Sequence, residues 1–149
     1  MQKVQFSIDI NAPKEKVWDA MLGDATYREW TSEFHPGSYY EGSWEEGADI
    51  RFIGPEADGS KSGMISRIKE SRPYEFVSIE HLGMIDHGVD ITEGPKVDEW
   101  VGMHENYTFT ETDGVTTVTV DMDVTPEFKD YMETTWPKAL NKLKEIAER

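Results

Sequence analysis

The side chains best suited to proton transfer in this chain are its four histidines, because the sequence has no cysteine. They are His35, His81, His87 and His104. No two of them have the His-x-x-x-His or His-Glu-x-x-His spacing that places metal ligands on one face of a helix. His87 directly follows Asp86 and is near His81 in the chain, which is only a weak metal pattern. We therefore expect no metal site and no cofactor.

One of these histidines has a candidate partner. If the apolar Ile79 points into the core, the two-residue period of a strand turns His81 to the same side. In the same way, Tyr107 places Glu105 on the inward face of a later strand. Antiparallel pairing would bring His81 opposite Glu105, where a carboxylate orients an imidazole and increases its basicity, as a general base requires. The alternative is a purely structural hydrogen bond, or an outward His81 in a different register.

The sequence indicates no nucleophile and no phosphate site. No serine stands in a Gly-x-Ser-x-Gly turn. The stretch Gly54–Gly59 is acidic and lacks the lysine of a phosphate-binding loop. The many carboxylates are spread over predicted strands and turns, without a glycosidase-like pair. Catalytic residues are therefore unknown at this stage, and the sequence leaves open whether the protein is an enzyme.

Large apolar side chains are abundant, with five Trp, six Tyr, six Phe and seven Met. Methionine is flexible and polarizable, and aromatic faces favour flat apolar ligands. Core packing explains many of these residues, and the interpretation we favour is that the others line a cavity. Together with His81 and Glu105, the candidate ligand-binding residues are Tyr40, Phe52, Met64, Tyr107, Met122, Met132 and Trp136.

The elements that must position these side chains are a first strand, two short helices, a series of strands and a long final helix. Val4–Ile10 alternates apolar and polar residues, as a half-buried strand does. Pro13 suits the start of a helix and Gly23 its end, and Asp24 can cap a second short helix that runs to about Phe34. Further strands are predicted at Tyr39–Trp44, Ala48–Gly54, Ser62–Glu70, Tyr74–Met84, Met103–Glu111 and Val115–Val124.

The last segment, Pro126–Arg149, is predicted to form a long helix. Thr125 stands at the capping position and Pro126 at the first helical position. Pro137 lies within the periodic stretch, where it should bend or split the helix. The apolar face of this helix is predicted to consist of Phe128, Met132, Trp136, Ala139, Leu140, Leu143 and Ile146.

The stretch Asp86–Glu99 carries two glycines, a proline and several acids, and is predicted to be a long mobile loop. Such a loop is either a lid or entrance to a site, or a plain surface excursion. The order of the elements favours an α+β fold in which a curved antiparallel sheet of about seven strands wraps around the C-terminal helix. This architecture leaves a cavity between the helix and the sheet.

Length and charge restrict the class of protein. The 149 residues fit a single domain, residues 1–149. The formal net charge of −15 repels nucleic-acid phosphates and anionic lipid headgroups, so we expect no nucleic acid and no membrane as a partner. Solubility is the simpler reason for this charge. The lack of cysteine and of an apolar signal peptide favours a cytoplasmic protein.

The order of several short motifs resembles that of START-like proteins, also called helix-grip or SRPBCC proteins. The chain resembles in particular the bacterial homologues of the activator of the heat-shock-ninety chaperone ATPase, and also polyketide cyclases. The resemblance covers essentially the whole chain and implies the helix-grip fold. Its motifs are Ile10–Trp18, Trp30, Gly47–Phe52, Gly63, Arg72-Pro73 and Trp136–Lys144.

Two departures limit what this resemblance implies. Many relatives carry Tyr and Trp in the strand after the proline turn, where this chain has Ser78 and Glu80. The usual pocket chemistry is therefore not carried over to these two positions. The eukaryotic chaperone activators also carry an additional domain, for which we expect no room in this chain.

The function that we prefer from the sequence is non-covalent binding of a small hydrophobic or amphipathic molecule in the cavity. One alternative is a cyclase- or dehydratase-type enzyme that acts on a polyketide-like substrate. Another is a chaperone-interacting module that resembles the ATPase activator. A small apolar molecule is thus the expected partner, and the chaperone is the less favoured one.

Overall fold

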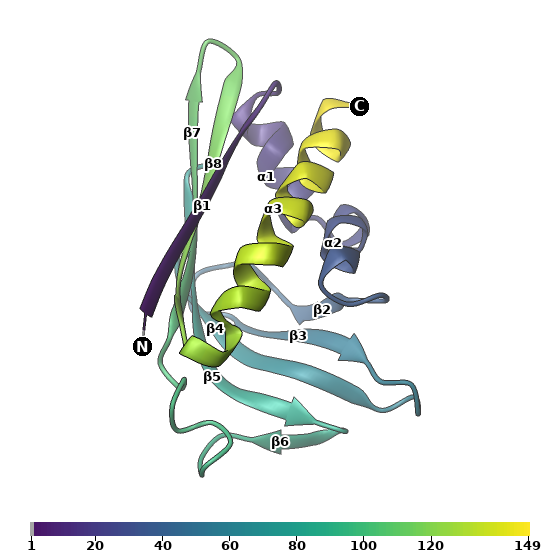
Figure 1. Cartoon of the computed structure of the whole chain (residues 1–149). Coiled ribbons are helices and arrows are strands. Elements are labelled where there is room, and N and C mark those ends of the chain that lie inside the picture. Colours follow the sequence, from purple (N-terminus) through teal and green to yellow (C-terminus); the bar gives the residue numbers. More distant parts are fainter. Residues whose placement is uncertain (1) are drawn as a thin grey trace.

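One antiparallel sheet of eight strands holds a long C-terminal helix (Figure 1). The computed structural model describes residues 2–149. The strands follow the order β1-β8-β7-β5-β4-β3-β2, and β6 pairs with β5. The α+β helix-grip fold is confirmed, with eight strands where about seven were expected. The elements are β1 (Gln2–Ile10), α1 (Lys14–Leu22), α2 (Asp24–Trp30), a 3-10 turn (Thr31–Glu33), β2 (Tyr39–Gly42), β3 (Asp49–Pro55), β4 (Lys61–Arg72), β5 (Phe76–Asp86), β6 (Val89–Ile91), β7 (His104–Thr112), β8 (Val115–Val124) and α3 (Pro126–Glu148).

The sheet is strongly bent. In Figure 1, β1, β7 and β8 stand beside α3, whereas β3 to β6 run across below the start of this helix. Two irregularities in the β4–β5 pairing contribute to the bend, since each leaves one extra residue unpaired. The first falls between Ile65 and Ser66, opposite Leu82, and the second between Ile68 and Glu70. The first bulge lies beside His81, so it also helps to set the direction of that side chain.

The helix α3 is buried only over its C-terminal part. Trp136 is 3 % exposed and Leu143 is fully buried, but Phe128 is 50 % exposed and Met132 is half-buried. Phe128 belongs to the predicted apolar face but is not packed against the sheet, because a hollow lies beside the start of the helix. Of the two effects expected at Pro137, a bend or a split, the split does not occur, because the helix is continuous through this residue. Pro137 has no N–H to donate to the carbonyl oxygen four residues earlier, and because this part of the helix is exposed, water can donate to that oxygen instead.

The predicted helix caps are only partly present. α1 follows Pro13 and ends at Gly23 as expected. Asp24 is the first residue of α2 rather than its cap, because Gly23 occupies that position. Thr125 stands at the capping position of α3, but its side chain makes no capping hydrogen bond. The amide of Phe128 instead donates to the Thr125 carbonyl oxygen at 3.1 Å.

Part of the predicted loop Asp86–Glu99 is a hairpin. β5 extends to Asp86, and β6 pairs back onto it. The segment that follows, residues 92–102, is anchored by the Lys96 ammonium, 2.6 Å from an Asp86 carboxylate oxygen, and by the fully buried Val97. The hypothesis of a lid therefore concerns residues 92–102. No helix of the described residues is long and apolar enough to cross a membrane.

Gly63 in β4 is required by the close approach of two backbones. A Cβ atom at Gly63 would lie 1.8 Å from the carbonyl oxygen of Phe52. We expect Gly63→Ala to lower the free energy of unfolding by about 1–3 kcal/mol, as overpacking typically does. Urea denaturation measures this loss.

The matched control is Gly59→Ala in the turn of the same hairpin. Gly59 also has a positive φ, +88°, but a Cβ there meets no atom within 4 Å. Gly59→Ala should therefore lower the free energy of unfolding by less than Gly63→Ala does. Equal losses would mean that backbone conformation, and not the contact with Phe52, makes glycine necessary at position 63.

Candidate ligand-binding site

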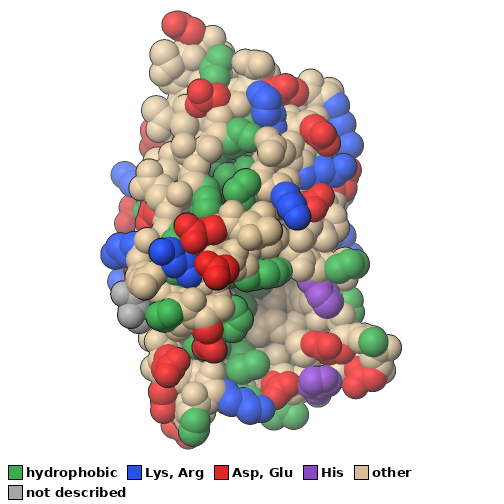
Figure 2. All heavy atoms as spheres, viewed as in Figure 1, with side chains coloured by type: hydrophobic (Ala, Val, Ile, Leu, Met, Phe, Trp, Pro, Cys, Tyr) green, Lys and Arg blue, Asp and Glu red, His purple; other side chains and the backbone are tan. Residues whose placement is uncertain are grey.

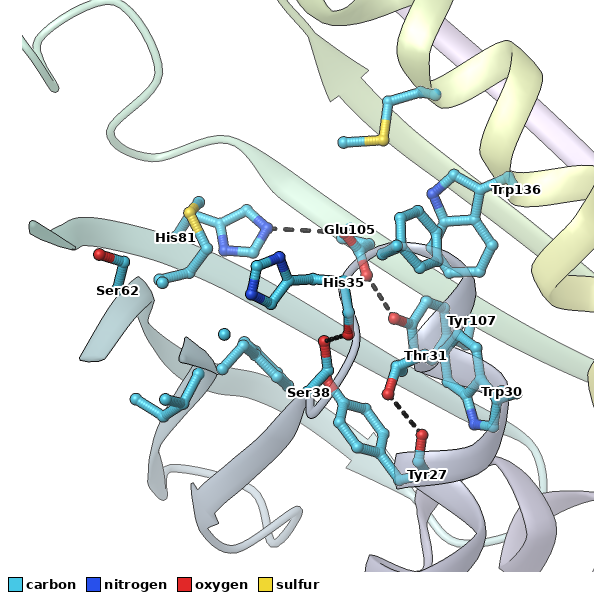
Figure 3. Close-up of a pocket in the computed structure, with 17 residues that line it drawn as sticks. Tyr27, Trp30, Thr31, His35, Ser38, Ser62, His81, Glu105, Tyr107 and Trp136 are labelled. Carbon is cyan, nitrogen blue, oxygen red and sulfur yellow. Dashed lines mark hydrogen bonds and ion pairs between the residues drawn. The ribbon is translucent and has the colours of Figure 1, made fainter. Parts of the chain in front are cut away.

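An inner chamber of about 390 Å³ lies between the bent sheet, α2 with its 3-10 turn, and α3 (Figure 3). Its walls are mainly aromatic. Trp136 of α3 is central to them, with ring centroids 5.8 Å from Trp30, 5.0 Å from Phe34 and 6.0 Å from Tyr107. The aromatic residues that line the chamber are Tyr27, Trp30, Phe34, Phe52, Tyr107 and Trp136.

A second and larger space, the outer hollow, adjoins the inner chamber. Its volume is about 720 Å³, and it lies between the segment 95–103, β4, β5 and the start of α3. The two spaces share Ser62, Gly63, Met64, His81, Glu105 and Met132 as lining residues. Figure 2 shows the molecule hollowed on this face, with hydrophobic and acidic side chains around the opening. The arrangement is therefore one continuous site with a smaller aromatic part and a larger part beside the start of α3.

A row of four polar side chains crosses the inner face of the sheet where the two spaces meet. His81 Nδ1 lies 2.8 Å from Ser66 Oγ, and His81 Nε2 lies 3.7 Å from Glu105 Oε1. The Tyr107 hydroxyl donates a hydrogen bond to the other oxygen of Glu105, Oε2. If Nε2 carries the imidazole proton, the Ser66 hydroxyl can donate to Nδ1, and all four side chains are then consistently oriented. Figure 3 shows Glu105 between His81 and Tyr107.

The predicted register of this pair is wrong, although the two side chains do meet. Glu105 is paired with Ile79, and the His81 amide donates to the Met103 carbonyl oxygen at 2.9 Å. His81 and Glu105 are therefore diagonal neighbours on one face, a relation in which long side chains still reach each other. The inward direction of His81 and Glu105 agrees with the prediction.

Burial controls the protonation of the phenol. Tyr107 is 3 % exposed, and this burial raises the pKa of its hydroxyl well above the usual value. The negative charge of Glu105 raises the same pKa further. Tyr107 is therefore a neutral donor at physiological pH, and it holds one carboxylate oxygen of Glu105 in place while leaving the other facing the site.

The candidate residues are not all in one place. The inner chamber is lined by Phe52, Met64, His81, Glu105, Tyr107, Met132 and Trp136. Met122 lines only the outer hollow. Tyr40 lines neither, since its ring packs edge-on against Tyr27 and its hydroxyl donates to the Leu22 carbonyl oxygen at 2.7 Å. Glu127, which helical periodicity places on the outer side of α3, lines the outer hollow.

Among the polar residues in or beside the site that had not been identified as such from the sequence are Ser66 and His35. Ser66 follows Met64 by two positions on β4, so the strand period could have placed it on the inner face. His35 lies in the loop after the 3-10 turn, where its Nε2 donates to the Pro55 carbonyl oxygen at 2.6 Å. Its ring rests on Gly54, where a Cβ atom would lie only 2.8 Å from it. No local pattern announces such a contact between distant segments.

The described residues offer no metal centre. No group of three or more His, Cys, Asp or Glu side chains in residues 2–149 is arranged to hold an ion. His87 and Asp86, which form the weak metal pattern, make an exposed ion pair with Nδ1 and Oδ1 2.8 Å apart. The Lys96 ammonium occupies the other oxygen of Asp86, at 2.6 Å. A cation at this carboxylate would have to displace Lys96.

Comparisons with known proteins identify the family. A family model described as "Activator of Hsp90 ATPase homolog 1-like protein" matches residues 11–148. No curated protein matches the chain significantly by sequence. A solved structure from Cytophaga hutchinsonii is 22% identical, with a TM-score of 0.74 over 99% of this chain and 94% of that one.

Two further solved structures are similar to this chain. The Aha1 dimer of Colwellia psychrerythraea is 20% identical, with a TM-score of 0.72 over 99% of this chain and 97% of that one. A putative protein in the dynemicin biosynthetic locus is 16% identical, with a TM-score of 0.68 over 97% of this chain and 46% of that one. At these identities the likeness shows a shared fold.

Proposed function

Because the chain belongs to the family of Activator of Hsp90 ATPase homolog 1-like proteins, within the SRPBCC superfamily, we propose that it binds a small hydrophobic or amphipathic molecule between α3 and the sheet. The observation that carries this proposal is the combination of an aromatic chamber with one row of oriented polar groups. Ligand sites are typically apolar cavities of about 300–1,000 Å³ with a few fixed polar groups. The inner chamber, at about 390 Å³, is of this kind.

The incomplete burial of α3 supports the same proposal. Phe128 is 50 % exposed and Met132 is half-buried, although a helix of this length normally buries its whole apolar stripe. Both side chains line the outer hollow. A ligand that entered there would cover them, and their exposure is then part of the binding surface.

The proposal is tested by native mass spectrometry of protein that has been purified without detergent. We expect a fraction of the protein to carry an apolar molecule in a one-to-one complex, and the extracted protein to gain thermal stability when that molecule is returned. A ligand that binds only the folded state raises the free energy of unfolding, by an amount that grows with the logarithm of its free concentration relative to Kd. Protein without any adduct, and without stabilisation by apolar compounds, would contradict the proposal.

A second candidate function is proton transfer on a bound carbonyl compound, as in a cyclase or dehydratase. The row Ser66–His81–Glu105–Tyr107 favours it, because an imidazole that is held by a hydrogen bond to Ser66 and lies beside a carboxylate can act as a general base. Turnover of a polyketide-like substrate that depends on His81 would distinguish this enzyme from a binding protein. For other partners, the net charge of −15 leads us to propose neither nucleic acid nor an anionic membrane.

A further inference from the structure

The outer hollow carries an excess of negative charge. Six carboxylate side chains line it, against one lysine and one histidine. Lys96 is bound to Asp86 at 2.6 Å, and Asp123 is paired with Lys3 at 2.9 Å. Glu56, Glu99 and Glu127 have no cationic side chain of residues 2–149 within ion-pair distance. A ligand with a negative headgroup would therefore enter against a repulsive field.

Glu105 is the one of these six carboxylates that lines both spaces, so it places negative charge at their junction. Its side chain is 18% exposed, and Tyr107 occupies only one of its oxygens. The other oxygen lies 3.7 Å from His81 Nε2, which is beyond hydrogen-bond distance. A carboxylate with one free oxygen inside a largely apolar site is stabilised by a cation, and no permanently charged side chain of the described chain supplies one.

The walls next to Glu105 suit a cation of a particular kind. Tyr107, Trp136, Trp30 and Phe34 surround the inner chamber, and aromatic faces attract weakly hydrated cations such as substituted ammonium groups. The outer hollow offers a different lining, with Met84, Met103 and Met122 in place of most of the rings. Methionine adapts to flexible apolar chains.

We infer that the ligand of this site is a cationic amphiphile, an apolar body that carries a protonated or quaternary ammonium group. The ammonium group lies against Glu105 and the aromatic walls of the inner chamber. The apolar body extends along the methionines of the outer hollow towards the start of α3. This inference rests on the proposed function, to which it adds the charge and orientation of the ligand.

The test compares three probes with the same ten-carbon chain, all below the concentration at which they form micelles: decyltrimethylammonium, decyl sulfate and neutral decanol. Binding is followed through the fluorescence of the tryptophans, two of which, Trp30 and Trp136, line the inner chamber. We expect the ammonium probe to bind about tenfold more tightly than decanol, and the sulfate probe more weakly than decanol.

The decisive variant is Glu105→Gln. It keeps the size of the side chain and an oxygen that can accept from Tyr107, but removes the charge. In this variant the affinity for decyltrimethylammonium should fall to its affinity for decanol, and a far-UV circular dichroism spectrum that matches the parent's shows that the variant is folded. Glu133→Gln is the matched control, because Glu133 is exposed on α3, lines neither space and changes the net charge equally.

The outcomes separate this inference from the proposed function. Equal affinity for the three probes, or a preference for the ammonium probe that persists in Glu105→Gln, would overturn the inference that the ligand is cationic. Binding of decanol in the same experiment would still support an apolar site. An equal loss in Glu133→Gln would also overturn it, since the attraction would then come from the net charge. Failure of all three probes to bind would remove the proposed function together with the inference.

Discussion

Replacing Trp136 by alanine is expected to lower the free energy of unfolding by about 3–5 kcal/mol, the range typical for removal of a large buried aromatic side chain. The indole is 3 % exposed and packs against Trp30, Phe34 and Tyr107. It also stacks on Phe6 of β1, with ring centroids 6.4 Å apart. Trp136 therefore connects α3 with the first strand, the short helices and the inner face of the sheet.

The loss in Trp136→Ala is measured by chemical denaturation. Phe128→Ala on the same helix is the control, because Phe128 is 50 % exposed and its truncation removes fewer contacts. We expect its effect to be much the smaller of the two. If Trp136→Ala unfolded at the same denaturant concentration as the parent, the inner chamber would already be so loosely packed that the indole contributes little to it.

The main elements of this fold could be predicted because their residue patterns are strong. β8 is an example, since buried and partly exposed residues alternate without interruption from Val115 to Val124. β6 could not be predicted, because its three residues lie among glycines and acids and are too few to show a period. It forms because β5 extends far enough to offer a free edge for pairing.

The composition of the site was more accessible to sequence reasoning than its geometry. Alternation along β5 and β7 placed His81 and Glu105 on the inner face, as the structure has them. The strand register could not be derived, because it depends on how residues 92–102 bring β7 back to β5. The contact of His35 with Gly54 was not foreseen either, since it joins a loop to β3 and no sequence period connects the two segments.

The position of Phe128 shows how a pattern can be correct and its usual meaning wrong. The residue continues the apolar stripe of α3, which normally indicates a contact with the core. In this protein the sheet bends away below the start of the helix, and the stripe faces the outer hollow. An apolar stripe thus identifies the inward side of a helix, but not whether protein or an open space lies there.

Met132→Trp is expected to abolish the binding of neutral apolar probes while leaving the melting temperature nearly unchanged. Met132 is half-buried and lines both the inner chamber and the outer hollow, so added bulk at this position obstructs their junction. In a close-packed core such a change typically costs about 1–3 kcal/mol, whereas an open space accommodates the larger side chain at less cost. Decanol binding is measured by calorimetry, and stability by thermal melting.

The control for this change is Thr134→Trp, which adds the same side chain to an exposed position of α3 that lines neither space. It should alter neither probe binding nor the melting temperature. Strong destabilisation by Met132→Trp would mean that the junction is filled by protein in solution. A folded Met132→Trp protein that still binds decanol with the parent's affinity would place the ligand outside both spaces. The roles proposed for His81, Glu105 and Trp136 would then be wrong, because these side chains contact a ligand only inside the site.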